Sequence, residues 1–140
     1  MRKAVAVIIA FLSLTTFIGS SFGWIGEKHG KRHRAEMKYT DPMKPIRVKV
    51  GKKFVIVLES NPTTGYQWQL AQPLDESKVK GLGSKYKGVH TKRVGAGGRE
   101  TWNFRSVGQG KTAISFQYVR PWEKGVAPGE MVTFEIEADF

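Results

Sequence analysis

The side chains best suited to catalysis or metal binding are few in this sequence. Its 140 residues include three histidines and no cysteine, so no thiol nucleophile, thiolate metal site or disulfide is available within them. His29 and His33 stand four residues apart, a spacing that can hold a metal, but the surrounding residues are cationic and would repel one. His90 stands alone in a lysine-rich stretch without a carboxylate pattern. The sequence therefore predicts no metal site, no cofactor and no enzymatic activity.

Recognition by loops is the chemistry that the residue pattern favours. One loop is the segment Asn61-Pro62-Thr63-Thr64-Gly65-Tyr66. Asn-Pro opens a turn, because proline fixes its own φ and holds the preceding residue extended. Gly65 can supply the positive φ that ends such a loop. A turn alone does not require two threonines between the proline and the glycine, so this loop is a candidate contact with a partner.

Two further loops have unusual compositions. One is the segment Gly95-Ala96-Gly97-Gly98, and the other is Arg120-Pro121-Trp122-Glu123. The glycine-rich segment lacks the spacing of a dinucleotide fingerprint, and a strand follows where a helix is required. It allows a close approach of backbone to another surface. Trp122 either folds back on the core or contacts a partner, and Trp and Arg dominate interface hot spots.

The elements that must position these loops are predicted to be short strands. Residues 46–50 alternate apolar and basic side chains, as an edge strand does, whereas 54–58 form the continuous apolar run of a central strand. Alternation recurs over residues 66–70, 102–106, 112–119 and 132–139. Residues 108–111 are predicted to form a hairpin turn, and residues 71–90 show no readable pattern.

About seven strands in about 95 residues, with no helical periodicity outside the N-terminal leader, predict an all-β fold. The architecture that fits is an immunoglobulin-like antiparallel β-sandwich with Greek-key connections. In such a sandwich the loops that connect alternate strands meet at one end. We therefore expect 61–65, 95–98 and 120–123 to reach the same tip.

The N-terminus has the pattern of an export signal. Met1-Arg2-Lys3 precedes an apolar run over 4–14, and Ser21-Phe22-Gly23 offers a cleavage point before Trp24. Residues 1–23 are predicted to be a signal peptide of a secreted or periplasmic protein. The alternative is an uncleaved membrane anchor, because the uncharged stretch is just long enough to span a bilayer.

The formal net charge of +11 is unevenly held, with +5 in residues 1–45 and +6 in the longer remainder of the chain. Residues 24–45 are basic and poor in apolar residues, which predicts a flexible linker before a single domain at 46–140. Such a linker would associate weakly with an anionic membrane. Neither a helix period nor interleaved aromatic residues accompany these charges, so we expect no nucleic-acid binding. We expect the domain to be a monomer.

The three loops, taken in order, resemble those of the chagasin family, small protein inhibitors of papain-like cysteine peptidases. Asn61–Tyr66 is similar to the family's NPTTG-aromatic loop, Gly95–Gly98 to its glycine-rich loop, and Arg120–Trp122 to its RPW loop. The resemblance covers roughly residues 46–140. It implies an immunoglobulin-like fold whose three loops enter the active-site cleft of the peptidase.

The resemblance also implies roles for individual residues. Thr63 and Thr64 would lie over the catalytic cysteine without presenting a cleavable bond. Small side chains and a stiff loop suit tight, reversible binding, because little entropy is lost on docking. The function expected on this basis is reversible inhibition of a papain-like peptidase. The alternative is an exported adhesion or carbohydrate-binding module in which the loops are only structural.

The other two loops would contact the walls of the cleft in the same picture. Gly97 and Gly98 would let their loop press against one wall. Trp122 would fill an apolar surface on the other wall, with Arg120 and Glu123 as polar contacts.

Overall fold

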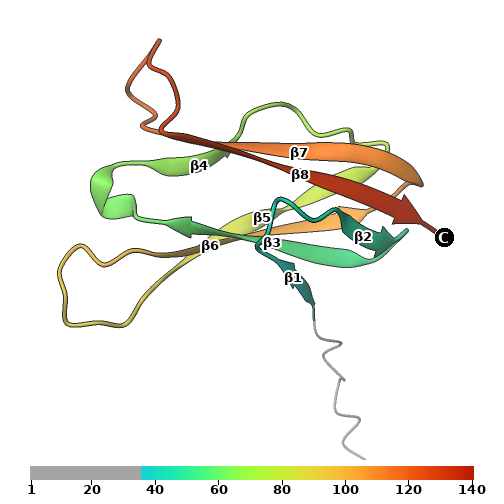
Figure 1. The fold of residues 1–140 in the computed structure, drawn as a ribbon, viewed down its shortest axis with the longest axis horizontal. Coiled ribbons are helices and arrows are strands. Elements are labelled where there is room, and N and C mark those ends of the chain that lie inside the picture. The colour runs from blue at the N-terminus through green and yellow to red at the C-terminus, as the bar shows by residue number, and fades with distance from the viewer. Residues whose placement is uncertain (1–35) are drawn as a thin grey trace, which may run out of the picture. The chain divides into compact units, whose positions relative to one another are not determined.

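Eight β-strands form two four-stranded sheets that pack face to face (Figure 1). The structure is a computed structural model that describes residues 36–140; the predicted leader, 1–23, and linker residues 24–35 lie outside this part. The elements are β1 (Met37–Tyr39), β2 (Ile46–Lys49), β3 (Lys53–Ser60), the 3-10 turn η1 (Pro62–Thr64), β4 (Gln67–Leu70), β5 (Val79–Gly88), β6 (Gly98–Ser106), β7 (Gly110–Val119) and β8 (Glu130–Asp139). Within 36–140, no helix has the length and apolar character needed to cross a membrane.

The strand order confirms the predicted immunoglobulin-like sandwich. The first sheet has the order β1-β3-β6-β5 and the second the order β2-β8-β7-β4. This arrangement corresponds to the ABED and GFC sheets of an immunoglobulin domain, with the extra edge strand β2 beside β8. The edge position predicted for 46–50 and the interior position predicted for 54–58 are both observed. Two strand pairs are parallel, β1 with β3 and β2 with β8, so the sheets are mixed rather than wholly antiparallel.

Two strands escaped the sequence prediction. β5 occupies much of the segment that showed no pattern, and only its first residue, Val79, is buried, so alternation is missing from its sequence. β1 lies inside the predicted linker and pairs in register with β3 through Met37 and Phe54. Three residues are too few to show a period. The domain therefore begins before residue 46, and the linker prediction is wrong for residues 37–39.

The predicted hairpin at residues 108–111 is also wrong. The chain there crosses from β6 in the first sheet to β7 in the second, so the flanking strands do not pair with each other. Gly108 packs against the backbone of Ser77, where a Cβ atom would collide with the Ser77 carbonyl oxygen. The two glycines are typical of a hairpin turn, but Gly108 here permits a close contact between backbone segments.

The core between the sheets is centred on Phe116. Its ring contacts the rings of Trp68, Trp102, Phe104 and Phe134 at centroid distances of 5.2–6.5 Å. Edge-to-face pairs of this kind stabilise a core beyond their area burial. The rings join β4, β6, β7 and β8, so the core fixes the strands that carry the loops.

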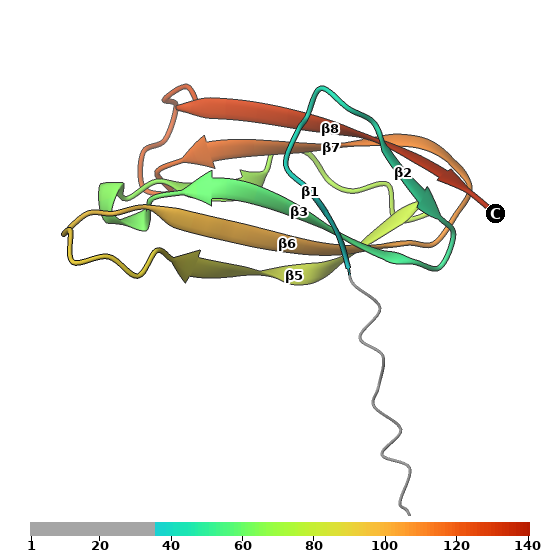
Figure 2. The same cartoon turned by 60° about the horizontal axis from the view of Figure 1, so that its bottom comes forward.

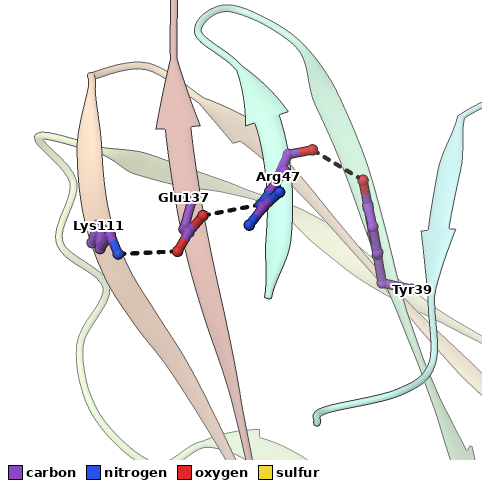
Figure 3. A network of polar contacts seen from close by, with 4 residues as sticks. All are labelled: Tyr39, Arg47, Lys111 and Glu137. Atoms are coloured by element: carbon purple, nitrogen blue, oxygen red, sulfur yellow. Dashed lines mark hydrogen bonds and ion pairs between the residues drawn. The ribbon is translucent and has the colours of Figure 1, made fainter. Parts of the chain in front are cut away.

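The outer face of the second sheet is held by paired charges. Glu137 Oε2 accepts a hydrogen bond from Arg47 Nε at 3.2 Å, and Glu137 Oε1 lies 3.1 Å from Lys111 Nζ (Figure 3). These contacts link β8 to its neighbours β2 and β7. The hydrogen bond and charge of Lys111, helped by Arg47, lower the pKa of Glu137. The hydroxyl of Tyr39 donates to the carbonyl oxygen of Arg47 at 3.3 Å (Figure 3). This bond links the edges of the two sheets.

Candidate binding loops at the tip of the sandwich

Three loops meet at one end of the sandwich, opposite the C-terminus (Figure 1, left). They are residues 61–66 between β3 and β4, 89–97 between β5 and β6, and 120–129 between β7 and β8. We call this end the tip. Its formation was expected from the order of the strands, and the contacts below show that the loops touch one another.

The first loop is folded on itself around Asn61. Pro62–Thr64 form one 3-10 turn, which Gly65 ends with a φ of +80°. The hydroxyl of Thr63 donates to Asn61 Oδ1 at 2.5 Å, and the hydroxyl of Thr64 donates to the Asn61 carbonyl oxygen at 2.6 Å. Both threonine side chains are therefore occupied within the loop, although both residues are exposed. Their hydroxyl groups hold the turn closed.

Asn61 also joins the first loop to the second. Its side-chain amide donates to the carbonyl oxygen of Gly95 at 3.1 Å, and its backbone N–H donates to the hydroxyl of Tyr118 at 2.8 Å. A Cβ atom on Gly97 would lie 3.2 Å from the carbonyl oxygen of Ser60, so this glycine permits close packing. One asparagine thus connects the first loop to the second loop and to β7.

The glycine-rich segment is buried at one end and exposed at the other. Gly98 belongs to β6 and is buried, and a Cβ atom there would collide with the backbone of Lys87 and Gly88. The outermost part of this loop is Val94, which is fully exposed, followed by Gly95 at a φ of +81°. The sequence reasoning did not single out Val94, and only its place between charged residues and glycines marks it.

Arg120 fastens the third loop to the first. Its Nε donates to the carbonyl oxygen of Thr64 at 3.2 Å, and its Nη1 lies 3.1 Å from Glu123 Oε1. Its guanidinium group also lies over the ring of Tyr66, 4.5 Å from the centroid, and that ring stacks on Tyr118. Arg120 and Glu123, expected as polar contacts with a partner, therefore have partners within the tip.

Trp122 lies on the first loop and not in the core. Its side chain is packed against Gly65, where an added Cβ atom would overlap the indole ring, yet 66% of the residue is exposed. Pro121 beside it is exposed as well. The indole ring therefore has one side supported by the first loop and much of its surface open to solvent.

The tip has the composition of a binding surface. It exposes threonines, prolines, Val94 and an indole ring together with Lys92, Arg93 and Lys124, while Arg120, Glu123 and both threonine hydroxyls bond within the tip. Across residues 36–140, no group of three or more His, Asp or Glu side chains is placed to hold a metal ion. The geometry supports contact with another molecule through shape and apolar surface.

Comparison with known proteins identifies the family. Residues 47–137 match the sequence profile described as Chagasin family peptidase inhibitor I42. The chain is 32% identical over 97 residues to chagasin of Trypanosoma cruzi, an alignment that covers 67% of this chain and 88% of that protein. This chain belongs to the chagasin family.

Solved structures show the same architecture. The cysteine protease inhibitor from Entamoeba histolytica superposes with a TM-score of 0.63 at 24% identity, covering 74% of this chain and 95% of that one. The ICP of Leishmania mexicana gives a TM-score of 0.51 at 28% identity, covering 72% and 90%. The matched region of the chagasin-family domain contains all three loops of the tip.

Proposed function

We propose that this protein inhibits papain-like cysteine peptidases by inserting the tip into their active-site cleft. The observation that carries the proposal is the mutual locking of the loops in a chain of the chagasin family. Asn61 joins the first loop to the second, and Arg120 and Trp122 join the third to the first. A surface that is already ordered loses little conformational entropy on binding, which favours tight and reversible association.

The first loop would block the catalytic cysteine without being cleaved. Thr63 and Thr64 are small and exposed, so the loop backbone can approach a nucleophile closely. Attack on a carbonyl carbon requires a near-attack geometry of the reacting atoms. To offer that geometry, the turn would have to give up the bonds from both threonines and from Arg120. The loop would therefore bind as a closed turn and leave uncut.

The other two loops would supply contact area on either side. Trp122 presents an indole ring that is held in place before binding, as hot-spot residues commonly are. Val94 offers a fully exposed apolar side chain on the second loop. Arg120 and Glu123 would act mainly by positioning the first loop, because their polar groups already bond within the tip.

Protection of the catalytic cysteine tests this proposal. Papain would be incubated with the full-length protein, and alkylation of its catalytic thiol by iodoacetamide would be followed by mass spectrometry. We expect alkylation to slow in proportion to the fraction of papain bound. An unchanged rate with the protein in excess over papain would show that the tip does not cover the cysteine.

A further inference from the structure

The outer face of the first sheet is strongly basic. We call it the basic face; Figure 2 shows its four strands side by side. Its cationic side chains share this face by strand register and are all exposed: Lys38, Lys53, Lys80, Lys85, Lys87, Arg99 and Arg105. Glu59 is the acidic residue on this face.

Like charges stand directly opposite one another on this face. Arg105 pairs in register with Lys53 on one side and with Lys80 on the other, and Arg99 pairs with Lys87. Directly opposed like charges destabilise a sheet. Among the ion pairs of residues 36–140, none involves a cation of the basic face. The repulsion around Arg105 is therefore not neutralised within the sheet, whereas Arg99 has Glu59 opposite it on β3 and Lys87 opposite it on β5.

The second sheet shows that the chain can neutralise such charges. On its outer face Arg47 and Lys111 pair with Glu137 (Figure 3). Lys49 pairs with Asp139 on the same face. The two outer faces belong to one domain of one composition, so overall basicity does not explain the difference. The unpaired cations are concentrated on one face.

The geometry of the basic face suits a long, flexible polyanion. Arg99 and Arg105 are six residues apart on β6, which corresponds to roughly 20 Å of strand. A groove of about 970 Å³, lined in part by Lys38, Lys87 and Arg99, opens at the end nearer the tip. Strand twist turns the charges progressively, so a flexible chain can follow them better than a flat bilayer can.

The side chains of this face narrow the chemical class of the ligand. It presents no aromatic ring outward, so stacking on nucleic-acid bases or on sugar rings is not available. Recognition would rest on charge, which sulfate groups supply at regular intervals along a polysaccharide. If the predicted export signal acts, the protein leaves the cell and does not meet intracellular nucleic acid.

We propose that the basic face binds a linear sulfated polysaccharide. This proposal does not rest on peptidase inhibition. The tip lies at the end of the strands and the basic face along their side (Figure 2). A polysaccharide held by Lys53, Lys80 and Arg105 would leave the loops free, whereas one that fills the groove would also reach Asn61 and Ala96 of the first two loops.

Heparin affinity with charge-matched variants tests the proposal. The face variant Lys80→Glu/Lys85→Glu/Arg105→Glu removes three cations of the basic face. The control variant Lys44→Glu/Lys52→Glu/Lys124→Glu makes the same change in net charge at exposed residues elsewhere. Both are made in the full chain, so the basic N-terminal segment contributes equally. The measurement is the salt dependence of binding to immobilised heparin, with thermal unfolding as a check on folding.

We expect the face variant to lose about three units of the slope of log Kd against log salt, since each cation contact contributes roughly one. The control should stay close to wild type. If the face variant unfolds, the corresponding glutamine substitutions should give the same loss of slope. Equal losses in face and control variants would overturn the proposal, as would failure of the wild type to bind heparin. Equal competition by duplex DNA at matched charge would overturn the assignment to a sulfated polysaccharide.

Discussion

Trp122 lies across Gly65 so closely that a Cβ atom at residue 65 would overlap its indole ring. Two of the three loops are thereby fitted to each other through a glycine and a tryptophan that stand 57 positions apart in the sequence. The same glycine has a φ of +80°. Residue 65 must therefore be glycine for two independent reasons, its positive φ and its contact with Trp122. Variants can separate the two effects.

Gly65→Ala should weaken both stability and inhibition. A non-glycine residue at this φ costs roughly 1–2 kcal/mol, and the added methyl group would displace Trp122 as well. The double variant Gly65→Ala/Trp122→Ala removes the clash and leaves the backbone cost. Thermal unfolding of the two single variants and the double variant gives the coupling energy. Additive effects would show that residues 65 and 122 do not act together.

Trp122→Ala should weaken inhibition of papain by about 2 kcal/mol, which is roughly 30-fold. The melting temperature should change little, because the residue is 66% exposed and lies outside the core. Inhibition constants and melting temperatures measured together distinguish contact with the peptidase from stabilisation of the fold. Phe140→Ala, which removes an exposed aromatic ring near the C-terminus, is a suitable control. An unchanged inhibition constant for Trp122→Ala would exclude this indole ring from the interface.

Arg120→Lys should loosen the first loop although the charge is kept. The guanidinium group of Arg120 bonds both the Thr64 carbonyl oxygen and Glu123 and also covers the Tyr66 ring. The ammonium group of a lysine cannot make these three contacts at once. We expect a higher inhibition constant and faster hydrogen exchange of the Gly65 amide. Arg99→Lys, on the basic face, is the matched control. Equal exchange rates in the two variants would argue against a positioning role for Arg120.

Glu100 should make stability depend on pH. It lies on the core side of β6, opposite Leu58, and burial raises its pKa above the usual value, 4.5, against the opposing effect of neighbouring donors. The folded state therefore holds the proton more tightly than the unfolded state, and stability falls as pH rises through the folded pKa.

Glu100→Gln should consequently raise the melting temperature at neutral pH, and its advantage should shrink as pH falls through the raised pKa of folded Glu100 and be lost below the usual value, 4.5. Glu59→Gln, the same change on the outward face of β3, is the matched control. Melting curves from pH 3 to pH 7 provide the comparison. A melting temperature of Glu100→Gln at or below wild type at neutral pH would contradict the assigned shift.

Much of the fold could be predicted because many of its strands have one buried face and one solvent-exposed face. β8 shows this best, since Phe134, Ile136 and Ala138 are buried and alternate with polar residues. β5 could not be predicted, because an edge strand that buries only Val79 leaves no periodic signal. The convergence of the loops followed from strand order in a Greek-key sandwich.

The sequence could not show which tip residues are exposed and which hold the loops together. Arg120 has the residue type of an interface contact, and only the folded chain shows that it bonds to Thr64 and Glu123. Gly98 reads as part of an exposed glycine-rich loop but is buried in β6. Such roles depend on contacts between segments that are far apart in the sequence, and local residue patterns do not predict those contacts.

Titration of papain with the full-length protein, followed by the intact mass of the recovered protein, tests the central claim most directly. If the locked tip occupies the cleft as a closed turn, activity should fall to zero at equimolar protein, and the recovered chain should be uncut. Full activity in excess protein would contradict inhibition. Inhibition accompanied by cleavage within residues 61–66 would contradict the mechanism, because the loop would then have served as a substrate.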